Sequence, residues 1–261
     1  MVFHFSYHKC ITVYYQRILN QIFDNSSKYK KARNLCLSRI TGRPYGYKHF
    51  NSLVGKFYDE WPRYRAASVN NHPIDFNKLG KYRATHFIRD PRDLVVSGYH
   101  YHRRGAEVWS RIKGPKVSDF AVVNGCIPDG MGPSHSFSDY LSQIDEEQGL
   151  IAEMDFRRNH FEGMAAWDYE NPDCLEIRYE EIMGNEAEVF DRIFNHYELD
   201  DRQRSVGLNA VDQHSARNRR GKDSHIRNPA SGQWRKHFTQ SVEDAFHQRY
   251  PNLLEHLGYD D

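Results

Sequence analysis

Hydrophobic residues recur along the chain with two periods that predict alternating strands and helices. Val2, Phe3 and Phe5 predict a short buried strand, and apolar positions after it recur at helical spacing. A second strand is predicted over 83–88, followed by a helix that begins at Pro91. The apolar helical positions are Val13, Ile18, Leu19 and Ile22 in the first helix and Leu94, Val95 and Tyr99 in the second.

The second half of the chain continues this alternation. Residues 174–179 predict a third strand, and 186–197 predict a helix with an apolar stripe. Strands that alternate with helices predict an α/β fold with a central parallel sheet flanked by helices, and ligands then bind at the carboxyl ends of the strands. The stretch 26–71 shows no clear period. No linker or repeat divides the sequence, so a single domain over residues 1–261 is predicted.

Composition narrows the class of protein. Lysine and arginine number 36 against 35 aspartates and glutamates, and this net charge of +1 argues against a general nucleic-acid binder. Positive charge gathers at 89–104 and 217–222, which suits a local polyanionic ligand. No membrane span and no secretion signal are evident, and the four cysteines are widely spaced. A cytoplasmic protein with reduced thiols is therefore expected.

The turn between the first strand and the first helix is a candidate phosphate site. Lys9 lies in this turn and Thr12 adds a hydroxyl, while backbone N–H groups at a helix N-terminus stabilise an anion. No glycine precedes Lys9, so the Walker pattern of ordinary ATPases and GTPases is absent. From this segment alone, a phosphate loop and an ordinary βα loop with a lysine both stay open.

A second candidate follows the strand at 83–88. Arg89 stands at the strand exit and Ser97 follows eight residues later, about two helical turns into the next element. A guanidinium and a hydroxyl together suit a phosphate clamp. The alternative is a loop-capping ion-pair network of Arg89, Asp90, Arg92 and Asp93, which usually contributes little.

A metal site is not expected from the histidines. His100 and His102 lie two residues apart, so they do not share a helix face, and no carboxylate companion is evident.

Four segments together resemble the signatures of sulfotransferases that use 3′-phosphoadenosine 5′-phosphosulfate (PAPS). Residues 7–13 resemble the family's Tyr-Pro-Lys-Ser-Gly-Thr-Thr-like loop, and Arg89 with Ser97 matches its Arg-x7-Ser element. Residues 227–235 resemble its Arg-Lys-Gly-x-x-Gly-x-Trp-Lys-like segment, and 179–181 its Tyr-Glu-Asp. Motifs in the right order and at suitable spacing are stronger than any one alone.

The resemblance implies a P-loop-like sulfotransferase fold and a reaction. A sulfuryl group would move from PAPS to an acceptor hydroxyl, on a glycan or a small molecule, leaving adenosine 3′,5′-bisphosphate (PAP), and no metal is required. Lys9 resembles the lysine that contacts the 5′-phosphate and the bridging oxygen. His72, in a segment corresponding to the family's Lys-Thr-His-x-Pro, resembles the general base.

The resemblance also assigns the remaining donor contacts. The 5′-phosphate loop comprises His8, Lys9, Cys10, Ile11, Thr12, Val13 and Tyr14, with Tyr14 packed on adenine. The 3′-phosphate clamp comprises Arg89, Ser97, Arg227, Asn228 and Pro229, and Tyr179 reaches the adenine amine. Trp234 is interpreted as a buried residue that fixes the clamp segment.

Departures from the family pattern keep two alternatives open. Ile11 replaces a glycine; either the loop is in an ordinary helical conformation there, or donor binding is impaired. Val13 replaces a threonine, Asn70 a lysine, and Pro229 a glycine whose N–H is lost. The alternatives are a degenerate, non-catalytic nucleotide-binding homologue and a kinase-like phosphoryl transferase. Acceptor identity and oligomeric state stay open.

Overall fold

A computed structural model describes residues 2–24, 58, 66–215 and 229–259. These residues fall into two compact units whose segments alternate along the chain. The first unit holds residues 2–24, 58, 66–89, 168–215 and 229–230, and the second holds 90–167 and 231–259. The single domain expected over residues 1–261 stays a prediction.

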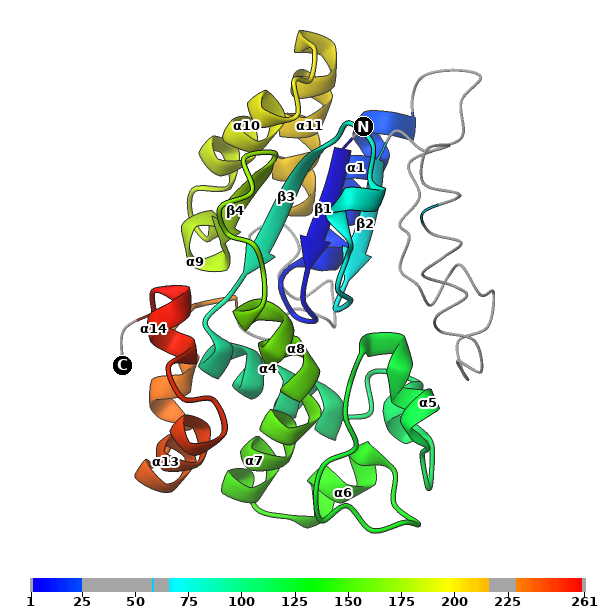
Figure 1. Cartoon of the computed structure of the whole chain (residues 1–261), viewed down its shortest axis with the longest axis vertical. Helices are drawn as coiled ribbons and strands as arrows, with labels where there is room; N and C mark the ends of the chain where they lie inside the picture. Colours follow the sequence, from blue (N-terminus) through cyan, green and yellow to red (C-terminus); the bar gives the residue numbers. More distant parts are fainter. Residues whose placement is uncertain (1, 25–57, 59–65, 216–228, 260–261) are drawn as a thin grey trace. The chain divides into compact units, whose positions relative to one another are not determined.

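Four parallel strands form the sheet of the first unit, in the order β2-β1-β3-β4 (Figure 1). They are β1 (Val2–Ser6), β2 (Ala66–Asn70), β3 (Arg83–Ile88) and β4 (Cys174–Arg178). The predicted α/β class with a central parallel sheet is confirmed, as are the three predicted strands. Strand β2 was missed because it holds one large apolar residue and lies at the sheet edge, where no alternating pattern is required.

The strand register decides which loops meet at the carboxyl edge of the sheet. Ser6 at the end of β1 pairs with Asn70 at the end of β2, and Ile88 at the end of β3 pairs with Arg178 at the end of β4. The turn after β1 therefore lies beside the loop after β2. The residue after β3 likewise lies beside the start of the helix that follows β4.

Buried strands hold this sheet in the core. All residues of β1 are buried, and β3 is buried from its second residue onward. Parallel sheets are covered on both faces, so their strands are continuous apolar runs rather than alternating ones. The polar residues of these two strands then need partners inside the unit.

Four side chains, one histidine, one threonine and two tyrosines, form a network that supplies some of those partners. The Nδ1 of His4 lies 3.1 Å from the hydroxyl of Thr85, and the Thr85 hydroxyl lies 2.6 Å from that of Tyr197. Tyr197 donates to the Phe3 carbonyl, and Tyr15 donates to Tyr197. Burial lowers the pKa of His4, so this imidazole is neutral and the network carries no buried charge.

Two of the described helices of the first unit carry predicted apolar stripes, and these stripes are buried with one exception. They are α1 (Thr12–Asp24), α9 (Tyr179–Ile182), α10 (Glu186–His196) and α11 (Asp201–His214), with a short 3-10 turn η2 (Phe76–Lys78). Ile18, Leu19 and Ile22 are buried as predicted, but Val13 is 46 % exposed. The buried position in the first turn is Tyr15, so the expected inward place of Val13 was wrong.

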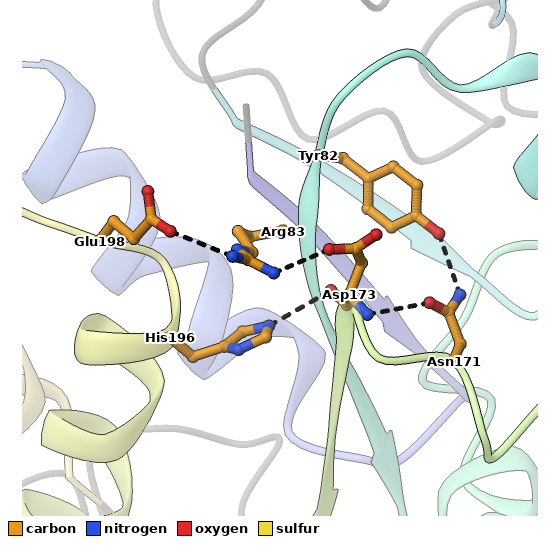
Figure 2. A network of polar contacts seen from close by, with 6 residues as sticks. All are labelled: Tyr82, Arg83, Asn171, Asp173, His196 and Glu198. Carbon is orange, nitrogen blue, oxygen red and sulfur yellow. Dashed lines mark hydrogen bonds and ion pairs between the residues drawn. The ribbon is translucent and has the colours of Figure 1, made fainter.

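The amino edge of the same sheet is closed by polar contacts (Figure 2). Arg83 at the start of β3 contacts Asp173 at 2.7 Å and Glu198 at 3.1 Å. Asn171 joins the backbone N–H of Asp173 to the hydroxyl of Tyr82. These contacts tie the starts of β3 and β4 to the end of α10.

The second unit is helical. Its longest helices are α4 (Pro91–Arg103), α7 (Glu146–Phe156) and α13 (Gln240–Arg249). The shorter ones are η3 (Trp109–Arg111), α5 (Val117–Phe120), η4 (Ala121–Val123), α6 (Phe137–Gln143), α8 (Arg158–Ala165), η5 (Gln233–Lys236) and α14 (Leu253–Leu257). As predicted, α4 begins at Pro91, and the Asp90 side chain caps it by accepting the Arg92 N–H.

A buried ionic cluster joins two of these helices. Glu153 on α7 accepts a hydrogen bond from Arg157 Nε at 2.8 Å and lies 2.7 Å from Nδ1 of His102 on α4. All three side chains are fully buried. Gly98 makes this approach possible, because a Cβ there would lie 1.9 Å from Glu153 Oε1. Removing one partner would leave a buried charge uncompensated, which is strongly destabilising.

Two further expectations concern membranes and cysteines. Among the helices that the structure describes, none combines the length and apolar character needed to cross a membrane. Among the described residues, Cys10, Cys126 and Cys174 form no disulfide with one another, and Cys36 lies outside these residues.

Candidate functional site

The turn between β1 and α1 has an unusual backbone. Lys9 has a φ of 78° and Ile11 a φ of 44°, and the Cys10 N–H between them donates to the Tyr7 carbonyl at 3.0 Å. The chain thereby reverses and enters α1 with the N–H groups of its first turn at the carboxyl edge of the sheet. That turn contains no acidic residue, so its partial positive charge is not opposed from within.

Ile11 occupies a left-handed conformation. A β-branched residue is disfavoured there by about 1–2 kcal/mol, because its Cβ crowds the following carbonyl. The alternative of an ordinary helical conformation at Ile11 was therefore wrong. Strained backbone of this kind persists only where surrounding structure fixes it, and it gathers at binding and catalytic sites.

Two asparagines at the end of β2 fix the turn. Asn70 Oδ1 accepts the hydroxyl of Ser6, and Ser6 Oγ lies 2.9 Å from Thr12 Oγ1. The Ser6 hydroxyl donates its one proton to Asn70. In its contact with Thr12, Ser6 therefore accepts and the Thr12 hydroxyl donates. The side-chain oxygen of Asn71 accepts the backbone N–H of His8. The strand register thus brings 70–71 against both ends of the turn.

The predicted base lies at the same edge. His72 directly follows Asn71 and is 7 % exposed. Asn71 has a φ of 64°, so the chain turns sharply between the end of β2 and His72. His72 and Lys9 are therefore carried by two adjacent loops that a hydrogen bond joins.

Arg89 and Tyr179 meet at the other pair of strand ends. The Arg89 guanidinium lies over the Tyr179 ring, with Cζ 4.1 Å from the ring centroid, and both side chains are buried. The Tyr179 hydroxyl donates to the Pro229 carbonyl. A cation over a buried aromatic face is worth about 0.5–2 kcal/mol. Tyr179 therefore joins the two segments to which the resemblance assigns the 3′-phosphate.

Tyr14 faces the helices of its own unit. Its hydroxyl donates to the Val211 carbonyl at 3.1 Å, and its ring meets that of Phe190 edge to face. Burial raises the pKa of Tyr14, with Glu186 and Asp212 adding to the shift. Its expected place on adenine stays a prediction, and occupying it would require these contacts to change.

The residues after Arg89 are arranged differently from the proposed ion-pair network. Asp90 and Arg92 do pair, at 3.0 Å, within the second unit. Asp93 instead accepts the backbone N–H groups of Gly232 and Trp234 at 2.8 and 3.0 Å. Arg92 Cζ lies 3.8 Å from the Trp234 ring centroid. This buried tryptophan fixes its segment, as interpreted from the sequence.

Three predicted clamp residues are not linked by described contacts. Ser97 lies on α4 in the second unit, half-buried. Arg227 and Asn228 lie outside the described residues. Their roles stay predictions.

Sequence reasoning missed the part played by the asparagines. Asn70 appeared only as the loss of a family lysine, although its register partner in β1 is Ser6. The pair of asparagines directly before His72 was the available signal, because asparagine tolerates left-handed backbone and caps turns.

Comparisons with known proteins identify the family of the chain. No curated protein matches the chain, but the family model described as "Sulfotransferase domain" matches residues 2–258. A crystal structure of mouse sulfotransferase SULT7A1 complexed with PAP is similar at 15 % identity, with a TM-score of 0.50, over 97 % of this chain and 84 % of that one. A retinol dehydratase in a complex with retinol and PAP is similar at 15 % identity and a TM-score of 0.50, over 97 % and 81 %. These likenesses show the fold, and the family model shows that the chain belongs to the sulfotransferase domain family.

Proposed function

We propose that this sulfotransferase uses PAPS as donor and moves its sulfuryl group to an acceptor hydroxyl, releasing PAP. The observation that carries the proposal is the β1–α1 turn, where Lys9 and the first turn of α1 lie at the carboxyl edge of a parallel sheet. Ligands of open α/β sheets bind at this edge. The two structural relatives above are described as PAP complexes, which supports the same choice of donor.

The residues of the turn suit the 5′ end of the donor. Helix N–H groups at 11–14 have no partners within α1 and suit the 5′-phosphate. Lys9 adds a full positive charge, placed to stabilise the negative charge that develops on the bridging oxygen as the sulfuryl group departs. Such preorganised charge is among the largest catalytic terms.

The Thr12 hydroxyl can donate a hydrogen bond to the phosphate only after it stops donating to Ser6. Its hydroxyl proton is donated to Ser6, which donates in turn to Asn70. We propose that donor binding turns the Thr12 hydroxyl towards the phosphate, while Ser6 stays bonded to Asn70. Asn70, which stands where the family has a lysine, then keeps the turn in place and contributes no charge.

The 3′ side of the donor suits the pair of Arg89 and Tyr179. A guanidinium binds a phosphate with two parallel hydrogen bonds, and the tyrosine ring holds it in one orientation. Ser97, Arg227 and Asn228 complete this clamp in the proposal. Tyr179 directs its hydroxyl to Pro229, so we assign it a positioning role in addition to the proposed contact with adenine.

His72 is the proposed general base. Histidine titrates near neutral pH, which suits removal of a hydroxyl proton at operating pH. Its place beside Asn71, which holds the β1–α1 turn, puts it on the loop next to Lys9. The acceptor is a hydroxyl on a glycan or a small molecule, and the cytoplasmic location stays a prediction.

A calorimetric titration with PAP, with ATP and Mg²⁺ as control, tests the proposal, followed by transfer of labelled sulfate from PAPS to a panel of hydroxyl compounds. PAP binding at a one-to-one ratio with transfer to at least one acceptor is expected. Binding of ATP with Mg²⁺ alone would overturn the proposal in favour of a phosphoryl transferase. PAP binding without transfer to any acceptor would favour the non-catalytic homologue, which the left-handed Ile11 makes the second candidate.

A further inference from the structure

A cluster of two histidines and a glutamate lies on the second unit, and none of its members is among the residues proposed to bind the donor. His100, Glu146 and His237 each offer one ligand atom, and these atoms all lie within 4.8 Å of one another. Nδ1 of His237 is 2.5 Å from Glu146 Oε1, and the two imidazole rings meet edge to face with centroids 5.1 Å apart. The geometry points to a binding site for a divalent transition metal, with Zn²⁺ as its occupant.

Three segments far apart in the sequence bring these ligands together. His100 comes from the last turn of α4, Glu146 is the first residue of α7, and His237 directly follows η5. A second contact holds the same two segments, because Thr239 donates to Glu147. Sequence spacing gave no hint of this cluster, since the carboxylate companion of His100 lies 46 residues further along the chain.

His100 and His102 of α4 contact different groups of residues. His102 points into the buried ionic cluster with Glu153 and Arg157, whereas His100 lies half-buried beside Glu146 and His237. The sequence indicated that His100 and His102 do not share a helix face and showed no carboxylate companion for them. In the structure each histidine has its own glutamate.

The ligand set selects the metal. Two imidazole nitrogens and one carboxylate oxygen suit Zn²⁺ and its neighbours in the transition series, whereas Mg²⁺ and Ca²⁺ prefer all-oxygen sites. In a tetrahedral zinc site, ligand atoms at about 2.1 Å from the metal lie about 3.4 Å from one another. To surround an ion, the three ligand atoms must shift from their present separations of up to 4.8 Å, and the 2.5 Å contact between His237 and Glu146 must open. Glu146 is exposed, which leaves the fourth position to water.

A zinc ion here would join α4, α7 and the segment after η5. The start of η5, directly before that segment, is held by Asp93 through the N–H groups of Gly232 and Trp234. The ion would therefore stabilise the second unit. The inference is independent of the proposed function, because it concerns ligands outside the donor-binding residues.

Isothermal titration of the metal-free full chain with Zn²⁺ tests this site. The wild-type chain is expected to bind one Zn²⁺ at the cluster, and His100→Ala and His237→Ala should each weaken that binding at least tenfold. His247→Ala removes an exposed histidine of α13 in the same unit and should leave it unchanged. Glu146→Gln, which keeps the shape of the side chain, should weaken it as well.

Two readouts separate loss of a ligand from loss of fold. Circular dichroism of each variant should match the wild type, and Zn²⁺ should raise the melting temperature of the wild type and His247→Ala but not of the ligand variants. Co²⁺ should give a visible absorption band that His100→Ala and His237→Ala lose. Equal Zn²⁺ affinity in wild type and both histidine variants, or no binding to the wild type, would overturn the inference.

Discussion

The two edges of the sheet in the first unit are built in opposite ways. At the amino edge, Arg83, Asp173 and Asn171 use their polar groups on one another and on the ends of α10 and β4 (Figure 2). At the carboxyl edge, Lys9 and Ile11 hold a left-handed backbone, and the first turn of α1 has no acidic residue to oppose an anion.

The polar side chains at the two edges therefore have different roles. Those at the amino edge join strands to a helix, and those at the carboxyl edge fix the backbone of the β1–α1 turn. At the amino edge, Arg83 pairs with the carboxylates of Asp173 and Glu198. At the carboxyl edge, Asn70 and Asn71 hold the β1–α1 turn, and the first turn of α1 is the place that we propose for the 5′-phosphate. Strained backbone gathers at binding and catalytic sites, and the left-handed Ile11 lies at the carboxyl edge.

Among these substitutions, Lys9→Ala at the carboxyl edge is expected to have the largest effect on turnover. Turnover should fall by about 10²- to 10³-fold, because a preorganised charge at the leaving group is lost. Affinity for PAP should change much less, since PAP carries no departing sulfuryl group. Lys81→Ala removes an exposed lysine just before β3, at the amino edge, and should leave both quantities unchanged. Equal losses of turnover and of PAP affinity would contradict the leaving-group role.

Arg89→Ala should come next in size. Loss of charge-assisted hydrogen bonds to the 3′-phosphate is expected to weaken PAP binding by roughly 10- to 150-fold, or about 1.5–3 kcal/mol. Adenosine 5′-phosphosulfate, which lacks the 3′-phosphate, should bind as before. Calorimetry with both ligands measures this, and Arg83→Ala at the amino edge is the matched control. A uniform loss for both ligands would mean that the clamp is misassigned.

Substitutions at Ile11 test whether its left-handed backbone is strained. Ile11→Gly should be more stable than Ile11→Ala by about 1 kcal/mol, because glycine adopts a positive φ without a steric penalty. Asn20 lies exposed within α1, so there the order should reverse, with alanine about 1 kcal/mol more stable than glycine. Urea unfolding of the four variants measures both differences. The same order at both positions would remove the strain argument.

Arg83→Ala is expected to have the smallest effect. Its partners Asp173 and Glu198 are 49 % and 68 % exposed, and exposed ion pairs contribute about 0.2–1 kcal/mol. Urea unfolding should therefore show a loss of less than about 1 kcal/mol, with unchanged PAP affinity. A loss of PAP binding in this variant would show that the two edges are coupled.

The sequence predicted the elements that carry strong periodic patterns. Strands β1, β3 and β4 and helices α1, α4 and α10 are at the predicted places, because their apolar residues are spaced for burial. Edge strand β2 lacked such a pattern, and its place is decided by pairing with β1. Val13 was placed inward by spacing alone, although the buried residue of that turn is Tyr15.

Side-chain pairings between distant segments were beyond a reading of one sequence. Arg89 over Tyr179 joins residues 90 positions apart, and Asn70 to Ser6 joins residues 64 apart. Both pairs depend on the strand register, which no local pattern fixes. The order of motifs predicted which residues belong to the site, whereas the register decides which of them contact one another.

Hydrogen–deuterium exchange with and without PAP tests the central contrast directly. Bound PAP should slow exchange at residues 6–14 and 70–72, where the backbone of the carboxyl edge surrounds the proposed phosphate site. Residues 81–83, 171–173 and 196–198 at the amino edge should exchange at the same rate in both conditions. Protection confined to the amino edge, or none at 6–14 under saturating PAP, would contradict the account.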